Sequence, residues 1–313
     1  MKEKIQEKIQ LLEKNINQVI VGKPLCIQNA LLTLLSNGHL LLKDVPGVGK
    51  TVLAKAIAKS IDGQFKRIQF TPDLLPTDIT GVSIFNQKEL SFEFKQGPVF
   101  TNILLADEIN RATPRTQSSL LEAMEERQVT VDGITYPLPQ LFFVIATQNP
   151  IEQQGTFPLP EAQLDRFLMC LSLGYPNLNE ETTILEQQRQ QHPLEKIQPI
   201  ITTQEVVQAQ QLCQQIHVDP SLKNYIVQIV RATREHKDVL LGASPRASLS
   251  LMRACQSKAF FQRKNYITPQ MVKELAIPIL CHRLILQPQS HIAGATAENI
   301  IEDILASTPV PIQ

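Results

Sequence analysis

The sequence lacks several features that would point to particular classes of protein. Its 313 residues carry no formal net charge, because 30 lysines and arginines balance 30 aspartates and glutamates. This balance gives no electrostatic argument for nucleic acid or an anionic membrane as the main partner. The cysteines are odd in number, widely spaced and without a C-x-x-C pair: Cys26, Cys170, Cys213, Cys255 and Cys281. This pattern favours reduced, buried thiols over disulfides or a zinc site.

Long apolar runs and targeting signals are also missing. No run approaches the ~20 residues of a membrane span, and Met1-Lys-Glu-Lys-Ile5 is too charged to begin a signal peptide. The composition, 43% hydrophobic and 19% charged, is typical of soluble globular proteins. We therefore expect a soluble, cytoplasmic protein of one or two domains, with no nucleic-acid partner and no membrane insertion.

A glycine-rich segment, Lys43-Asp-Val-Pro-Gly-Val-Gly-Lys-Thr51, follows the apolar residues 40–42 and precedes a good helix-forming segment. A strand, a glycine-rich turn and a helix in this order are the context of a phosphate-binding loop. Gly47 and Gly49 would let successive N–H groups converge on phosphate oxygens at the start of the helix.

Two side chains of this segment have predicted roles. Lys50 would reach the β- and γ-phosphates, and the hydroxyl of Thr51 would bind Mg²⁺. Position 44, where the general pattern has its first glycine, is Asp44. Considered alone, the segment could also be a structural turn that binds no nucleotide.

Two further apolar runs end in polar residues. Residues 103–106 lead into Asp107 and Glu108, and residues 141–147 lead to Asn149. Buried parallel strands deliver such residues to the carboxyl edge of a sheet, where ligands bind. Asp107 would hold Mg²⁺, often through water, Glu108 could polarise the attacking water, and Asn149 could touch the γ-phosphate. The alternatives are that Asp107 caps a helix and that Asn149 favours a turn before Pro150.

The first half of the chain mixes helix and strand patterns. Apolar residues at three- and four-residue spacing predict an amphipathic helix over residues 2–19, and a second helix follows over 25–36. Strands are predicted at 39–43, 65–70, 103–108, 141–147 and 168–173. Hairpins are predicted at 81–94 and 129–136, the second with Asp132-Gly133 in its turn. The first hairpin is either a projecting working loop or an ordinary surface excursion.

The strand pattern disappears from Pro176 onward. Helices are predicted over 180–190, 204–216, 221–236, 245–262, 269–286 and 297–306. Pro278 predicts a kink or break inside the fifth of them. In Ser244-Pro245-Arg246, serine can cap the helix and proline suits its first position. Arg246 opposes the helix dipole there, a small penalty that a nearby anion would remove; the other interpretation is a surface arginine tolerated at that cost.

Five motifs together resemble one family. They are the phosphate loop, Leu-Leu-Ala-Asp-Glu-Ile-Asn-Arg-Ala, Ala-Thr-Gln-Asn-Pro, Leu-Asp-Arg-Phe and Gly-Ala-Ser-Pro-Arg-Ala, in that order. In this combination the chain resembles the MoxR branch of AAA+ ATPases from about residue 21 to residue 286. The resemblance implies an α/β fold: an AAA+ P-loop αβα sandwich with a five-stranded parallel sheet in residues 1–175, followed by a small all-α lid domain in residues 176–313.

The resemblance also implies roles for individual residues. Lys50 and Thr51 match the Walker A pair, Asp107 and Glu108 the Walker B pair, Asn149 sensor 1, Arg166 the arginine finger and Arg246 sensor 2. Arg111 is a candidate for an additional role toward a neighbouring subunit. Members of this branch often carry a residue other than glycine at the position of Asp44. The residues expected to bind the nucleotide are Val21, Gly22, Pro46, Gly47, Val48, Gly49, Lys50, Thr51, Val52 and Arg246.

At the level of function, the resemblance implies an ATP-hydrolysing, Mg²⁺-dependent motor that forms a homo-oligomeric ring, usually hexameric. It would act as a chaperone-like remodelling or maturation factor for a protein client, and proteins with a von Willebrand factor A domain are candidate clients in this family. The hairpins at 81–94 and 129–137 resemble the helix-2 insert and the pre-sensor-1 insert of this clade. Two alternatives remain: the motor subunit of a metal-chelatase-type complex, and a scaffold that binds ATP without meaningful turnover.

Overall fold

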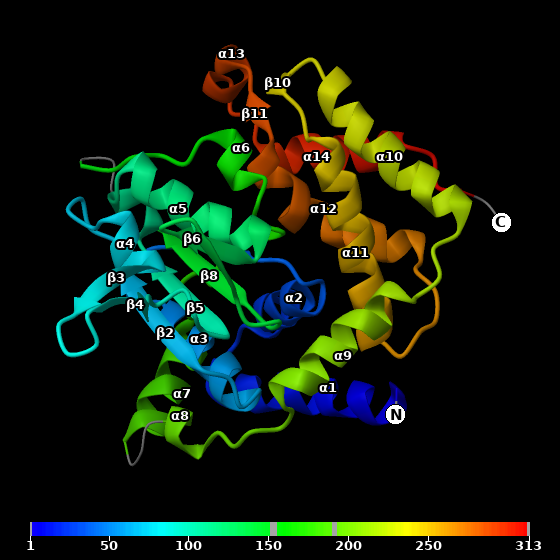
Figure 1. Ribbon diagram of the computed structural model, residues 1–313. Coiled ribbons are helices and arrows are strands. Elements are labelled where there is room, and N and C mark those ends of the chain that lie inside the picture. Colours follow the sequence, from blue (N-terminus) through cyan, green and yellow to red (C-terminus); the bar gives the residue numbers. More distant parts are fainter. Residues whose placement is uncertain (1, 151–154, 190–192, 312–313) are drawn as a thin grey trace.

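Five parallel strands form the central sheet in the order β2-β5-β8-β1-β9 (Figure 1). The computed structural model describes residues 2–150, 155–189 and 193–311. The strands of the sheet are β1 (Leu40–Lys43), β2 (Phe65–Gln69), β5 (Ile103–Asp107), β8 (Phe143–Gln148) and β9 (Met169–Leu171). The predicted five-stranded parallel sheet is confirmed.

Both faces of the sheet are buried, which explains why its strands are almost uniformly apolar. Side chains alternate along a strand, so Leu40 and Leu42 enter one core and Leu41 the other. The first core also contains residues of α1 (Lys2–Asn17), α2 (Pro24–Leu35) and α3 (Lys50–Ser60). The second core contains residues of α4 (Pro76–Thr80), η1 (Ile109–Arg111) and α5 (Pro114–Glu126), and α6 (Glu161–Leu164) packs against it through Leu164.

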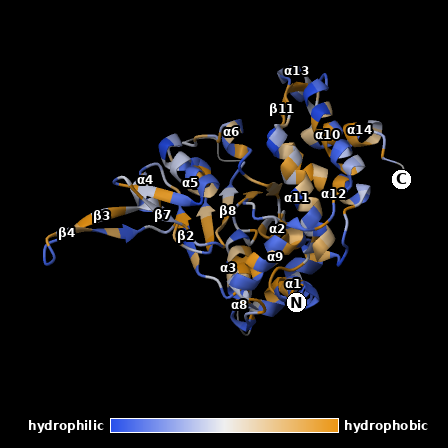
Figure 2. Ribbon diagram, turned by 45° about the vertical axis from the view of Figure 1, so that its right-hand side comes forward, coloured by the Kyte–Doolittle hydropathy of each residue, from blue (hydrophilic) through white to orange (hydrophobic). Residues whose placement is uncertain are grey.

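The two predicted hairpins are present. They are β3 (Gly81–Asn86) with β4 (Ser91–Gln96), and β6 (Gln128–Val131) with β7 (Ile134–Pro137). The β3–β4 hairpin projects from the body (Figure 2), and it exposes Leu90 (78%) and Phe92 (76%). The rings of Phe94 and Tyr136 stack with their centroids 4.2 Å apart, so the two hairpins contact each other.

The C-terminal half is mainly helical. Its helices are α7 (Leu178–Gln188), α8 (Pro193–Lys196), α9 (Thr203–Gln214), α10 (Pro220–Glu235), α11 (Pro245–Phe261), α12 (Pro269–Leu280), η2 (Cys281–Arg283), α13 (Pro288–Ile292) and α14 (Ala297–Ser307). Helices α7 and α8 lie below α3, apart from the group that contains α10, α11, α12 and α14 (Figure 1).

The expectation of an all-α lid is wrong in one detail. Strands β10 (Val239–Leu241) and β11 (Ile285–Leu286) pair antiparallel, and each is too short to show a period-two pattern in the sequence. The helix predicted over 269–286 continues through Pro278 and ends two residues later, at Leu280, so the predicted extension to residue 286 is wrong. The predicted helix end at Gln190 lies outside the described residues.

Helix α1 contacts both halves of the molecule. Gln6 Nε2 donates a hydrogen bond to the carbonyl oxygen of Phe260 at 2.9 Å, and Asn15 Nδ2 donates to Ser60 Oγ at 3.0 Å. The first contact reaches the end of α11 and the second the end of α3. The division into residues 1–175 and 176–313 stays a prediction.

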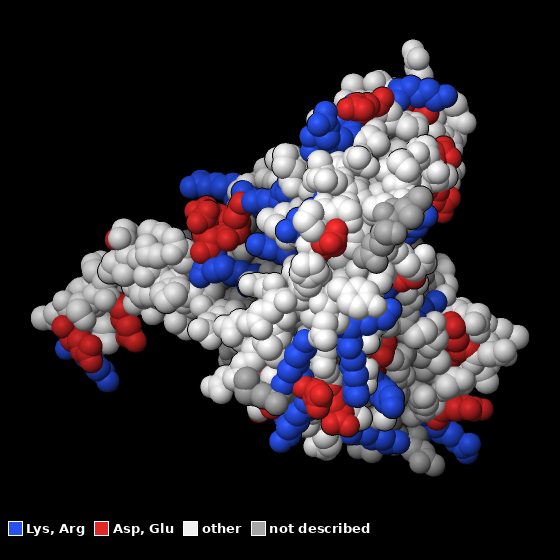
Figure 3. Space-filling view, turned by 90° about the vertical axis from the view of Figure 1, so that its right-hand side faces the viewer, with Lys and Arg blue, Asp and Glu red and all other residues white. Residues whose placement is uncertain are grey.

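The surface carries charges of both signs. Basic and acidic side chains are interspersed on the face shown in Figure 3, as the zero formal net charge leads one to expect. Within the described parts of the chain, no helix combines the length and apolar character needed to cross a bilayer.

Asp44, which replaces the usual glycine, fastens the start of the glycine-rich loop to the end of β9. The residue is buried, and its carboxylate accepts hydrogen bonds from Ser172 Oγ at 2.7 Å and from the backbone N–H groups of Leu173 at 2.6 Å and Gly174 at 3.0 Å. A glycine could make none of these contacts. The departure from the general pattern therefore has a structural role.

Arg283, at the end of η2, fastens the helical half to the segment that follows α6. Its side chain is 2% exposed, and its Nε lies 2.7 Å from Asp165 Oδ1. The guanidinium also donates to the carbonyl oxygens of Phe167 and Leu168. Burial lowers the pKa of Arg283, and the hydrogen bond and charge of Asp165 oppose this shift. The pair therefore keeps a buried charge fully compensated.

Restoring the usual glycine at position 44 should weaken the fold. Because Asp44→Gly leaves one buried and one partly buried backbone N–H group without their acceptor, we expect the free energy of unfolding to fall by about 1–3 kcal/mol in a urea titration. Ser172→Ala is the matched control, since it removes only one of the three donors and should cost less. Equal stability of Asp44→Gly and the parent protein would contradict this role.

Arg283→Met should be more destabilising, by about 3–5 kcal/mol, because it leaves Asp165 without its buried partner. The measurement is again the urea midpoint and slope. Arg231→Met provides the comparison: Arg231 forms an exposed pair with Glu235, and losing such a pair costs at most about 1 kcal/mol. A loss for Arg283→Met no larger than that of the control would show that the buried pair does not stabilise the fold.

Candidate functional site

The carboxyl ends of β1, β5 and β8 bring most of the predicted site residues into one pocket of about 400 Å³. Of those residues, its lining includes Pro46, Gly47, Gly49, Lys50, Thr51, Val52, Asp107, Glu108 and Asn149. These residues come from three separate parts of the sequence. We refer to this cavity as the phosphate pocket.

The loop at its floor has the backbone shape that convergent N–H groups require. Gly47 and Gly49 have φ of 87° and 95°, left-handed values that other residues adopt only with strain. Helix α3 begins directly afterwards at Lys50, so its N-terminus faces the pocket. The ammonium group of Lys50 donates to the carbonyl oxygens of Asp44 at 3.0 Å and Val45 at 2.8 Å. The lysine is thus held across the loop.

Asp107 and Thr51 supply the oxygen donors that suit Mg²⁺. Both line the phosphate pocket, and Mg²⁺ is usually bound by one or two protein oxygens together with phosphates and water. Asp107 Oδ1 accepts from Thr147 Oγ1 at 2.6 Å, and Oδ2 accepts from Arg67 Nη2 at 2.7 Å. The oxygen donors of Thr51 and Asp107 therefore fit a magnesium ion, which these two residues would hold together with phosphate and water.

Glu108 is fixed by both its backbone and its side chain. It has a left-handed φ of 56°, and its N–H donates to Thr147 Oγ1 at 2.8 Å. Its Oε2 accepts from Gln69 Nε2 at 2.7 Å and lies 2.9 Å from Arg111 Nη1. Arg111 therefore contacts the predicted catalytic carboxylate of its own chain.

A second, smaller pocket of about 200 Å³ adjoins the first and shares Gly47, Gly49 and Val52 with it. Its mainly apolar lining includes the predicted Val21 and Val48, together with residues that the sequence did not single out: Val19, Ile20, Pro176, Ile184 and Pro193. An apolar pocket next to a phosphate site suits a nucleotide base. Gly22, also predicted, lines neither pocket and packs against Glu180.

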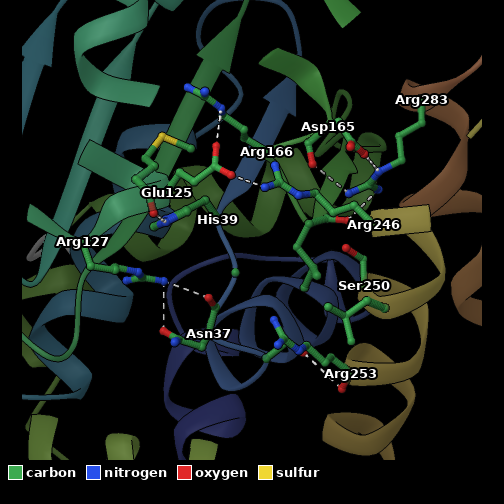
Figure 4. Close-up of a pocket in the computed structure, with 15 residues that line it drawn as sticks. Asn37, His39, Glu125, Arg127, Asp165, Arg166, Arg246, Ser250, Arg253 and Arg283 are labelled. Atoms are coloured by element: carbon green, nitrogen blue, oxygen red, sulfur yellow. Dashed lines mark hydrogen bonds and ion pairs between the residues drawn. The ribbon is translucent and has the colours of Figure 1, made fainter. Parts of the chain in front are cut away.

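The two predicted site arginines, Arg166 and Arg246, lie outside both of these pockets. Arg166 and Arg246 line a pocket of about 390 Å³ that shares no lining residue with the phosphate pocket, and both point toward Glu125 (Figure 4). Arg166 Nε lies 2.9 Å from Glu125 Oε2, and Arg246 Nη2 pairs with Oε1. Glu125 is thus the nearby anion that offsets the helix dipole at Arg246. We refer to this cavity as the arginine pocket.

Ser244 does not act as the side-chain cap that the sequence suggested. It stands at the N-cap position of α11, but its oxygen accepts no hydrogen bond from a backbone N–H of the helix, and its hydroxyl donates to Asp165 Oδ2 at 2.8 Å. Pro245 occupies the first helical position, as predicted. The serine therefore connects the start of α11 to the residue that precedes Arg166.

Several polar residues of these pockets had no predicted role, among them Arg67, Gln69 and Glu125. Arg67 and Gln69 stand on β2, and the pairing of β2 with β5 places them beside Asp107 and Glu108. Their spacing of two residues near the end of a strand was the available signal. For Glu125, one of several carboxylates on an amphipathic helix, the sequence contains no comparable signal.

The comparisons with known proteins agree with this geometry. The profile described as "ATPase family associated with various cellular activities" matches residues 39–169, and the one described as "AAA lid domain" matches residues 231–304. A solved structure from Cytophaga hutchinsonii, of a protein assigned as an ATPase, superposes with a TM-score of 0.93 at 40% identity, covering 99% of this chain and 97% of that one.

Similar sequences cover nearly the whole chain. The uncharacterised protein YeaC of Bacillus subtilis is 52% identical over 96% of this chain and 94% of its own length. Chaperone MoxR1 of Mycobacterium tuberculosis is 42% identical over 95% of this chain and 80% of its own. Protein MoxR of Paracoccus denitrificans is 30% identical over 96% and 95%. With the parallel sheet, the phosphate pocket and the lid, these similarities show that the chain belongs to the MoxR family of AAA+ ATPases.

Proposed function

We propose that this ATPase works as a homo-oligomeric ring, usually hexameric, in which each active site is completed by a neighbouring subunit. The observation that carries the proposal is the separation of the two pockets within one chain. Lys50, Thr51, Asp107, Glu108 and Asn149 share the phosphate pocket, whereas Arg166 and Arg246 line the arginine pocket. An arginine that acts on the γ-phosphate from the arginine pocket must serve the nucleotide of another copy.

The binding step uses both of the adjoining pockets. The base enters the apolar pocket beside Val21 and Val48, and the phosphates lie along the loop with the β- and γ-phosphates near Lys50. Thr51 and Asp107 would hold Mg²⁺, which when bound neutralises negative charge on the phosphates. Gly22 has no part in this arrangement.

Glu108 and Asn149 orient the attacking water. Phosphoryl transfer depends mainly on positioning and charge stabilisation, so a water aligned with the γ-phosphate is the main requirement on the protein. Glu108 is already fixed by Gln69 and Arg111 through its Oε2, which limits how its carboxylate can turn. Arg166 of the adjacent copy then supplies positive charge as the transition state forms.

The output of hydrolysis is a movement applied to a protein client. One relative is described as a chaperone. The β3–β4 hairpin projects from the body (Figure 2), and its side chains Leu90 and Phe92 are exposed. Exposed apolar groups of this kind suit contact with another protein. We assign the hairpin to the client, which in this family can bear a von Willebrand factor A domain. Arg246 contacts the nucleotide from α11 and thereby couples the state of the nucleotide to the position of the lid.

Mixing two inactive variants tests the shared active site. Arg166→Ala should lower ATP turnover by about 10³–10⁵-fold while leaving ATP binding intact. Glu108→Gln should bind ATP without hydrolysing it, but it retains its arginines. A mixture of the two should therefore recover turnover, measured as released phosphate. Arg231→Ala, which removes an exposed arginine, should behave like the parent protein. Unchanged turnover of Arg166→Ala, or no recovery in the mixture, would exclude the shared site.

Metal removal tests the role of Thr51 and Asp107. Chelation by EDTA should lower turnover by at least about 100-fold, since a bound metal contributes several kcal/mol to stabilising such transition states. Added Mg²⁺ should restore the rate in the parent protein but not in Asp107→Asn. Asp62→Asn, in an exposed turn, makes the same chemical change outside the pocket and should respond to Mg²⁺ like the parent protein. Turnover that persists without metal would refute this assignment.

A further inference from the structure

Glu125 bridges the two arginines that the proposed mechanism assigns to the neighbouring subunit's nucleotide. It lies in the last turn of α5, and one carboxylate oxygen pairs with Arg166 while the other pairs with Arg246 (Figure 4). The three side chains come from separate parts of the sequence. Their convergence gives a single anion two guanidinium partners.

The charge of the arginine pocket favours an anion of higher charge than one carboxylate. Its lining includes five arginines (Arg127, Arg166, Arg246, Arg253 and Arg283) and two carboxylates (Glu125 and Asp165). Asp165 is already engaged by Arg283 and Ser244. Burial and the adjacent charge of Arg127 lower the pKa of His39 well below its usual value, so this histidine is neutral at pH 7. The positive charge of the arginines therefore exceeds the negative charge around them.

The bridge is also accessible to a competitor. The side chains of Glu125, Arg166 and Arg246 are 32%, 28% and 44% exposed. Exposed ion pairs contribute only about 0–1 kcal/mol, so such a pair can exchange partners at little cost. Guanidinium groups bind carboxylate and phosphate oxygens through the same forked geometry.

We propose that Glu125 occupies, within each subunit, the place that phosphate oxygens of the adjacent subunit's nucleotide take in the assembled ring. This inference rests on the proposed function. A carboxylate and a phosphate repel each other at hydrogen-bonding distance. The phosphate must therefore displace Glu125 before both arginines can bind it.

The exchange has a structural result. Glu125 is carried by α5 of the core, whereas Arg246 is carried by α11 of the lid. Their ion pair is a contact between core and lid within one subunit. When phosphate replaces Glu125, this contact is lost and Arg246 is held by the neighbouring subunit instead. The nucleotide of one subunit thereby loosens the lid of the next.

The test uses tripolyphosphate as the probe and the full chain with Lys50→Ala, which disables the phosphate loop. Titration calorimetry at low salt measures the dissociation constant of tripolyphosphate for the Lys50→Ala protein and for a second protein that carries both Lys50→Ala and Glu125→Gln. Glutamine keeps the size and one acceptor oxygen but removes the charge. We expect the dissociation constant for tripolyphosphate to fall by about tenfold. Glu122→Gln, an exposed position on the same helix, should leave it unchanged.

One further variant tests whether the tighter binding depends on the two arginines. Adding Arg166→Ala and Arg246→Ala to the Glu125→Gln protein should abolish the tighter binding. The proposal is overturned if Glu125→Gln binds the probe no more tightly than its parent, which would mean that Glu125 holds the arginines ready for phosphate. It is also overturned if the gain survives without both arginines. Because the titration needs no hydrolysis, its outcome is separate from that of the mixing experiment.

Discussion

The carboxylate of Asp165 fixes the relative positions of the two arginines that define the proposed subunit contact. One of its oxygens pairs with the buried Arg283, and the other accepts from Ser244. Asp165 directly precedes Arg166, and Ser244 stands two residues before Arg246. A single, partly buried anion thus joins the core segment that carries one arginine to the lid helix that carries the other. Through these contacts, Asp165 helps to hold Arg166 and Arg246 close enough for Glu125 to pair with both.

Much of the fold and the residues of the phosphate pocket could be predicted, because the patterns that indicate them lie within short segments of the sequence. Apolar runs that end in polar residues mark buried parallel strands, and the carboxyl ends of such strands lie at one edge of the sheet. This reasoning alone brings Lys50, Asp107 and Asn149 together. The hairpin at Asp132-Gly133 could also be predicted, because this residue pair favours a turn with positive φ at both positions. Both residues have positive φ in the structure.

What could not be predicted depends on pairings between distant residues. Glu125 and Arg246, which form an ion pair, are 121 positions apart in the sequence. The pairing of β10 with β11 joins Val239 to Leu286. The periodic spacing of apolar residues does not indicate which distant residues contact each other. Asp44 shows the opposite case: its departure from the loop pattern was visible, but its partners lie about 130 residues further on, at the end of β9. Only the fold gives the reason for it.

The contact between the two hairpins makes a continuous mechanical connection through the subunit. Phe94 of the projecting hairpin stacks on Tyr136 of the second, and the second hairpin begins two residues after the end of α5. The last turn of that helix carries Glu125. The tip of β3–β4 is thus connected to Glu125 through one aromatic stack, the pairing of β7 with β6 and the short turn between β6 and α5. Under the proposed function, a client bound at this tip and the nucleotide of the adjacent subunit would therefore both act on Glu125.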